Sequence, residues 1–106
     1  MTTIAKQWQA MYRTREAVFG AMPEPQWRML VDLAESGRCT VGSICIASGA
    51  PLSTARRHLE CLQESGLIER SPHGHDRRSG VIALSPTGAD RMADLQARIL
   101  REDGGR

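Results

Sequence analysis

The chain has 106 residues, of which 41% are hydrophobic and 25% charged, as in a soluble globular protein with one modest core. Its formal net charge is only +2, so a nucleic-acid partner has to be argued from where the charges lie. The sequence has no bilayer-length apolar run and no signal-peptide pattern at its start. We therefore expect a single domain over residues 1–106, in the cytoplasm and without a membrane partner. The three cysteines are odd in number and well separated, which argues against a disulfide framework.

The first predicted helix covers residues 3 to about 19, where apolar side chains recur at helical spacing. Gly20 and the Pro23-Glu24-Pro25 segment that follows are expected to end it. The stripe consists of Ile4, Trp8, Met11 and Val18, with Tyr12 and Phe19 beside it.

A second helix is predicted from Gln26 to about Ser36, because Pro25 suits a first helical turn, where its missing N–H has no cost. Gly37 is expected to close it. The side chains predicted to face inward are Trp27, Leu30, Leu33 and Ala34.

A short strand over residues 38–40 and a third helix from Val41 to about Ser48 come next. Thr40 is a suitable N-cap, because its hydroxyl can accept from a free amide of the first turn. The inward residues of this helix are predicted to be Val41, Ile44 and Cys45. Gly49-Ala50-Pro51 then forms a tight turn, which completes a helix-turn-helix unit with the next helix.

The fourth helix begins near Pro51 and ends at Gly66, a residue that adopts a left-handed C-terminal conformation without steric cost. Its apolar residues share one face, its polar residues lie about half a turn away, and Thr54 and Arg56 lie on the two flanks. The apolar face holds Ala55, Leu59 and Leu62, and the polar face holds Ser53, Arg57, Glu60 and Glu64.

Two short β-prone runs, 67–70 and 81–84, flank a segment from Pro72 to Gly80 that has the composition of a turn and contains Arg77 and Arg78. A helix with a polar outer face followed by a basic hairpin is the layout of a winged helix-turn-helix. The sequence therefore predicts a small protein that binds duplex DNA.

Ser85 as N-cap and Pro86 in the first turn predict a last helix. Residues 101–106 are expected to be a frayed tail. The apolar stripe of this helix is predicted to hold Ala89, Met92, Leu95 or Gln96, and Ile99. The predicted fold is thus mainly α with a small β-hairpin wing, in the order helix, helix, short strand, helix, helix, strand, strand, helix.

Several segments of this chain resemble the MarR-type winged-helix transcription regulators. The most specific is Asp76-Arg77-Arg78 after a Gly-Leu-Ile-Glu-Arg strand at 66–70, and the likeness covers roughly residues 24 to 90. The other matching segments are 25–30, 40–47, 53–62, 82–85 and Gly88.

This resemblance implies a homodimer that binds duplex DNA as a sequence-specific regulator, expected to be a repressor. One recognition helix per subunit would enter successive major grooves, and each wing would reach a minor groove. The residues expected to contact DNA are Ser53, Thr54, Arg56, Arg57, His73, His75, Arg77 and Arg78, with Asp76 orienting one of the two wing arginines, Arg78 in preference. The dimer would use the terminal helices, 1–20 and 86–103, through Ile4, Trp8, Met11, Met92, Leu95 and Ile99.

The chain departs from the family pattern at three places. It is shorter than is usual for the family, whose dimers use long terminal helices. Pro51 and Leu52 stand where the family commonly has Ser and a polar or basic residue, which removes a phosphate contact. His73 and His75 add titratable groups that a typical wing lacks.

Other functions are weighed against DNA binding. No catalytic constellation is apparent, so we expect neither an enzyme nor a cofactor. His58 and Cys61, with the wing histidines, have the atoms of a metal site but no evident geometry for one, and Cys61 is a weak candidate for a redox switch. The resemblance allows a small-molecule effector. The alternative from another class is a winged-helix module that binds protein, since Glu60 and Glu64 share the polar face of the fourth helix.

Overall fold

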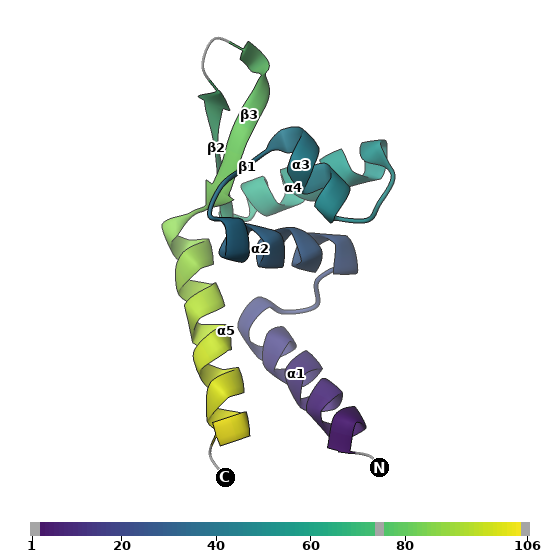
Figure 1. The fold of residues 1–106 in the computed structure, drawn as a ribbon, viewed down its shortest axis with the longest axis vertical. Coiled ribbons are helices and arrows are strands. Elements are labelled where there is room, and N and C mark those ends of the chain that lie inside the picture. The colour runs from purple at the N-terminus through teal and green to yellow at the C-terminus, as the bar shows by residue number, and fades with distance from the viewer. Residues whose placement is uncertain (1–2, 74–75, 105–106) are drawn as a thin grey trace. The chain divides into compact units, whose positions relative to one another are not determined.

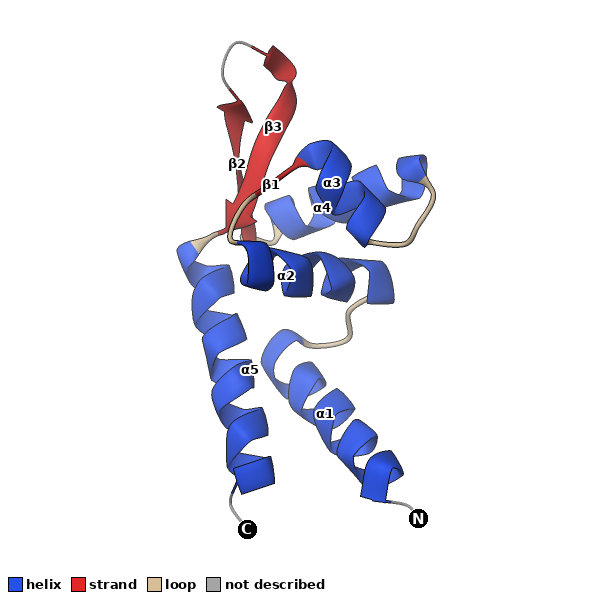
Figure 2. Ribbon diagram, viewed as in Figure 1, coloured by secondary structure: helices blue, strands red, loops and turns tan. Residues whose placement is uncertain are grey.

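The structure, a computed structural model, is mainly helical with a small antiparallel sheet (Figures 1 and 2). It describes residues 3–73 and 76–104, and the side chains of residues 3–71 and 80–101. The elements in chain order are α1 (Thr3–Phe19), α2 (Glu24–Ser36), β1 (Cys39–Thr40), α3 (Val41–Ala47), α4 (Leu52–Glu64), β2 (Ile68–His73), β3 (Asp76–Leu84) and α5 (Pro86–Gly104). The predicted order of elements and the winged-helix fold class are confirmed.

The chain divides into two compact units. Unit 1 consists of Met1–Met22 and Asp90–Arg106, and therefore holds α1 and most of α5. Unit 2 is Pro23–Ala89 and holds α2, α3, α4, the sheet and the first turn of α5. The helix-turn-helix and the hairpin thus belong to the same unit.

The core of unit 2 is built from the apolar faces of its helices and the inner face of its sheet. Ala55, Leu59 and Leu62 of α4 are buried, as their spacing predicts. The other buried apolar residues of this unit are Met29, Leu30, Leu33, Ile44, Cys45, Leu67, Ile68 and Ile82.

The inward face of α2 was predicted only in part. Leu30 and Leu33 are buried, but Ala34 is exposed and Trp27 is half-buried. Met29, which the sequence analysis did not place inward, is fully buried. The buried face is centred on Leu33, which places the indole of Trp27 and the small side chain of Ala34 at its edge.

Three predicted end signals are confirmed. The Thr40 hydroxyl accepts from the Ser43 amide at 3.1 Å, so Thr40 caps α3. Gly66 follows α4 with φ +80°, the left-handed conformation that favours glycine. The Ser85 hydroxyl accepts from the Gly88 amide at 3.0 Å at the start of α5.

The sheet has three antiparallel strands in the order β1-β3-β2, with Cys39 opposite Ile82 and Ile68 opposite Leu84. The prediction of a turn over Pro72–Gly80 was wrong, because β2 runs to His73 and β3 begins at Asp76. Pro72 of β2 pairs with Gly80 of β3. Because β2 is an edge strand, a residue without an N–H is tolerated at this position. A register shift follows at His73.

Helix α5 is longer than predicted, since its backbone stays helical to Gly104 and no frayed tail begins at residue 101. Arg101-Glu102-Asp103 contains no residue that stops a helix. Within the predicted stripe only Leu95 is buried. Met92 and Ile99 are half-buried, whereas Ala89 and Gln96 are exposed.

The glycine at 88 is required by packing. A Cβ on Gly88 would collide with the carbonyl oxygen of Leu67, a backbone atom that cannot move aside as a side chain can. Gly88→Ala should therefore lower the free energy of unfolding by about 3 kcal/mol, measured by urea denaturation. Gly42→Ala is the matched control, because a Cβ there meets nothing within 4 Å in another helix. It should be neutral or stabilising by about 0.5 kcal/mol. Equal losses in the two variants would contradict this account.

Candidate nucleic-acid interface

Helices α3 and α4 form a helix-turn-helix whose turn is held by local hydrogen bonds. The Ser48 hydroxyl donates to the Cys45 carbonyl at 2.6 Å and accepts from the Ala50 amide at 3.1 Å. Gly49 has φ +76°, a backbone conformation that residues with a side chain rarely adopt. The Ala55 amide then donates to the Pro51 carbonyl at 2.8 Å as α4 begins. These bonds fix the direction in which α4 leaves the turn.

The predicted DNA-contacting residues of α4 are all exposed, namely Ser53, Thr54, Arg56 and Arg57. Arg57 lies opposite the buried face, and with the described residues it forms no hydrogen bond or ion pair. Arg56 lies on one flank of α4, and its charge partly opposes the raised pKa of the Cys45 thiol of α3. Of the two arginines, Arg57 is therefore the one directed furthest from the protein's own core.

The other flank of α4 is tied to α2. The Gln26 side-chain nitrogen lies 3.0 Å from His58 Nδ1, so His58 accepts this hydrogen bond when its Nδ1 is unprotonated. This pairing gives His58 a role in joining two helices. In the described part of the chain, no group of three or more His, Cys, Asp or Glu side chains is arranged to hold a metal ion.

Charge along α4 is segregated from one end to the other. Arg56 and Arg57 lie in its N-terminal half, whereas Glu60 and Glu64 are exposed in its C-terminal half. A polyanion would be attracted to the first half and repelled by the second. The part of α4 whose charge would attract a polyanion is thus about its first two turns.

The β2–β3 hairpin extends from unit 2 beside α3 and α4 (Figure 1). The backbone of Arg77 and Arg78 belongs to strand β3, and Asp76 pairs with His73 at its start. The side chains of these four residues, and all of His75, lie outside the described residues. Arg70 of β2 packs across Gly80, since a Cβ there would meet the Arg70 side chain.

All three cysteines are free. Burial raises the pKa of the Cys39 thiol, and the charge of Asp32, whose carboxylate accepts from this thiol at 3.7 Å, raises it further. Burial likewise raises the pKa of the Cys45 thiol, against a smaller opposing effect of Arg56. A raised pKa leaves less thiolate near neutral pH, so neither thiol is activated as a nucleophile. Cys61 is exposed on α4.

Unit 1 carries the residues predicted to form a dimer interface. Ile4, Trp8 and Met11 are spaced along α1, and they are 69%, 52% and 36% exposed. The Trp8 and Tyr12 rings lie with centroids 6.0 Å apart, and Arg15 lies over the Tyr12 ring at 5.3 Å. The predicted residues of α5 are less exposed, with Leu95 buried. An apolar row is therefore left uncovered mainly on α1.

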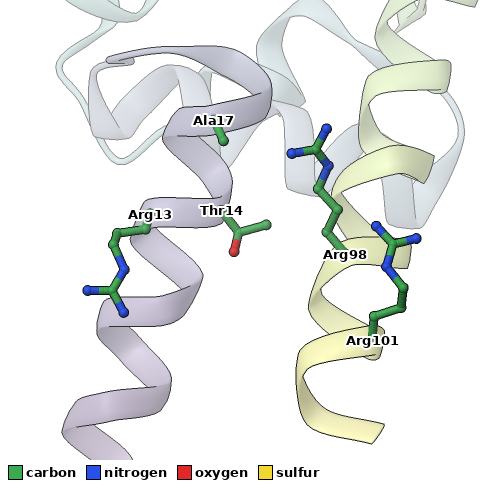
Figure 3. A pocket seen from close by; sticks show the side chains of 5 residues that line it. All are labelled: Arg13, Thr14, Ala17, Arg98 and Arg101. Atoms are coloured by element: carbon green, nitrogen blue, oxygen red, sulfur yellow. The ribbon is translucent and has the colours of Figure 1, made fainter. Parts of the chain in front are cut away.

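Within unit 1, a pocket of about 440 Å³ lies between α1 and α5. Figure 3 shows Thr14 directed from α1 toward α5 and Arg98 extending toward α1. The Thr14 hydroxyl is satisfied by the Ala10 carbonyl at 2.8 Å, and Arg98 pairs with Asp94 at 3.1 Å. This pocket was not predicted from the sequence, and it is lined by Arg13, Thr14, Ala17, Arg98 and Arg101. The available signal was the pair of arginines three residues apart on α5.

A family model, that of the MarR family, matches residues 22–79, which cover the second helix, the helix-turn-helix and the hairpin. The chain belongs to the MarR family. It is therefore a winged-helix DNA-binding transcription regulator and not an enzyme.

Solved structures share the fold of this MarR-family protein. RV1404 from Mycobacterium tuberculosis is 24% identical with a TM-score of 0.88, over 97% of this chain and 70% of RV1404. NadR in complex with 4-hydroxyphenylacetate is 15% identical with a TM-score of 0.77, over 98% of this chain and 72% of NadR. A mutant MarR from E. coli complexed with operator DNA is 20% identical with a TM-score of 0.69, over 94% of this chain and 72% of that one. No curated protein matches the chain.

None of the helices in the described part of this MarR-family protein is long and apolar enough to cross a membrane.

Proposed function

We propose that this MarR-family protein is a homodimeric, sequence-specific repressor that occupies a roughly palindromic operator. In this proposal α4 enters the major groove and the β2–β3 hairpin reaches the adjacent minor groove. The observation that carries it is the exposed first half of α4, where Ser53, Thr54 and Arg57 are free to meet a partner. The mutant E. coli MarR with the same fold is bound to operator DNA, which supports the same mode of binding here.

The chemistry of these residues suits base recognition. An α-helix fits the major groove, where each base pair presents a distinct pattern of donors and acceptors. The Arg57 guanidinium can donate two parallel hydrogen bonds to guanine, while Ser53, Thr54 and Arg56 can contact bases or phosphates. Arg77 in the hairpin suits a narrow minor groove, whose negative potential is enhanced. In a dimer, half-sites about one helical turn apart would match the protein's two-fold symmetry.

A protein-binding winged helix is the competing function, favoured by the exposed acids Glu60 and Glu64. Salt separates the two functions. If the logarithm of the association constant for duplex DNA falls linearly with the logarithm of the salt concentration, binding displaces counterions from the phosphates, which supports the proposal. A chain that binds no duplex at low salt would support the protein-binding module.

Two substitutions test the DNA contacts. Arg57→Ala should weaken the free energy of DNA binding by about 1–3 kcal/mol and relax specificity at one base position, because it removes a base contact. Arg77→Ala should weaken binding evenly across sequences and reduce the salt slope, because it removes a phosphate or minor-groove contact. Arg91→Ala, which removes an exposed arginine of unit 1, is the control and should change neither the affinity for DNA nor its dependence on salt. Binding isotherms on sequence variants at several salt concentrations measure both effects. Unchanged isotherms for both test variants would refute the assignment.

The dimer is proposed to form through the terminal helices, on the apolar row of α1. Trp8→Glu should yield monomers, because it would place a charge where an apolar side chain is buried against a partner. Gln9→Glu adds the same charge at the neighbouring position, outside the apolar row, and should leave the dimer intact. Sedimentation velocity distinguishes the two states. A dimeric Trp8→Glu variant would place the interface elsewhere.

A small-molecule effector is proposed for the pocket between α1 and α5. The NadR structure of the same fold contains 4-hydroxyphenylacetate, a carboxylic acid, and the pocket here carries three arginines. Aromatic carboxylates should therefore release the protein from its operator. Arg98→Ala should weaken that response about tenfold by removing a charge-assisted hydrogen bond, with Arg91→Ala as the control. Titration of operator complexes with a panel of such acids checks this, and equal responses of the two variants would exclude a role for this pocket.

A further inference from the structure

Two large hydrophobic side chains on the described surface of unit 2 are exposed, and they flank the turn of the helix-turn-helix. Ile46, near the end of α3, is 82% exposed, and Leu52, the first residue of α4, is 59% exposed. Among the described residues, the other large hydrophobic side chains that are exposed belong to unit 1.

The position of Leu52 is one from which base edges are reached. In a helix-turn-helix, the N-terminal residues of the second helix contact bases, whereas the first helix crosses the DNA backbone. Leu52 directly precedes Ser53 and lies one turn before Arg56, so it belongs to the half of α4 that carries the exposed basic residues. Ile46 belongs to the first helix and lacks this access to bases.

A leucine side chain has no donor or acceptor, which limits what it can recognise in a groove. Opposite the amino group of adenine or cytosine, or the acceptors of guanine, it would leave a desolvated polar group unpaired. The C5-methyl of thymine is the one alkyl group that base pairs present in the major groove. We propose that Leu52 recognises a thymine methyl group at one base pair of each half-site, an inference that rests on the proposed function.

The test uses uracil, which differs from thymine only by that methyl group. An operator is first obtained by selection from random duplexes with the wild-type protein, and a fixed thymine is expected in each half-site. Each thymine is then replaced in turn by uracil, and dissociation constants are measured by fluorescence anisotropy for wild type, Leu52→Ala and Ile46→Ala. All three should fold equally well, because both side chains are exposed; thermal unfolding checks this.

For the wild type, uracil at one symmetry-related position should weaken binding about fourfold per half-site, the effect of removing one buried methyl group. Leu52→Ala should bind the thymine operator more weakly and lose the discrimination against uracil. Ile46→Ala should keep the full discrimination, since its side chain lies on the other side of the turn.

Other outcomes overturn the proposal in distinguishable ways. Equal discrimination by wild type and Leu52→Ala would mean that another residue contacts the methyl group. Specific binding without any effect of uracil would mean that no methyl group is recognised. In both cases the proposed DNA-binding function would stand. If selection yields no preferred duplex at all, sequence-specific binding itself fails and the role of Leu52 fails with it.

Discussion

The relation between the two proposed DNA-contacting elements depends on a small set of hydrogen bonds made by the hydroxyl and the amide of Ser85. Its hydroxyl donates to the Gly66 carbonyl and accepts from the Gly88 amide, and its amide donates to the Leu67 carbonyl at 3.0 Å. These bonds join the segment between α4 and β2, at Gly66 and Leu67, to the first turn of α5. The direction of the hairpin relative to α4 is therefore set by nearly rigid groups, and both elements belong to unit 2. A recognition helix and a wing that contact adjacent grooves need such a fixed relation.

The features that sequence predicted well are those in which one residue type has few physical uses. Thr40 and Ser85 could be assigned as caps because a hydroxyl before a helix satisfies a free amide. Gly66 could be assigned as a helix end because a left-handed residue is required there. The hairpin was harder, because Pro72 and Gly80 have the composition of a turn. In the structure Pro72 lies on an edge strand and Gly80 lies against the side chain of Arg70. Both placements depend on pairing between strands, which local sequence does not encode.

Features set by packing between distant segments were the least predictable. Periodicity indicated that α2 had an inward face but not its rotation, so Met29 was missed and Ala34 was wrongly included. The pocket of unit 1 exists only because Thr14 on α1 and Arg98 on α5, 84 residues apart in a 106-residue chain, face a common space. The α4 residues Ser53, Thr54, Arg56 and Arg57 were accessible to prediction because a single helix fixes which side chains share a face. Whether they touch DNA stays a prediction.

Charge distribution bears on how such a protein would separate operator from other DNA. Non-specific affinity comes from neutralised phosphates, and a net charge of +2 with Glu60 and Glu64 on the recognition helix provides little of it. On the proposed function, the acids would repel phosphates along the second half of α4, so close approach would be favourable only where the first half is well matched to the bases. Weak general attraction lowers the background of non-specific complexes, which compete with the operator by sheer number. On the proposed function, discrimination would then depend on a few contacts near the N-terminus of α4. An apolar contact suits this arrangement, because it adds no attraction to the phosphates that every sequence shares.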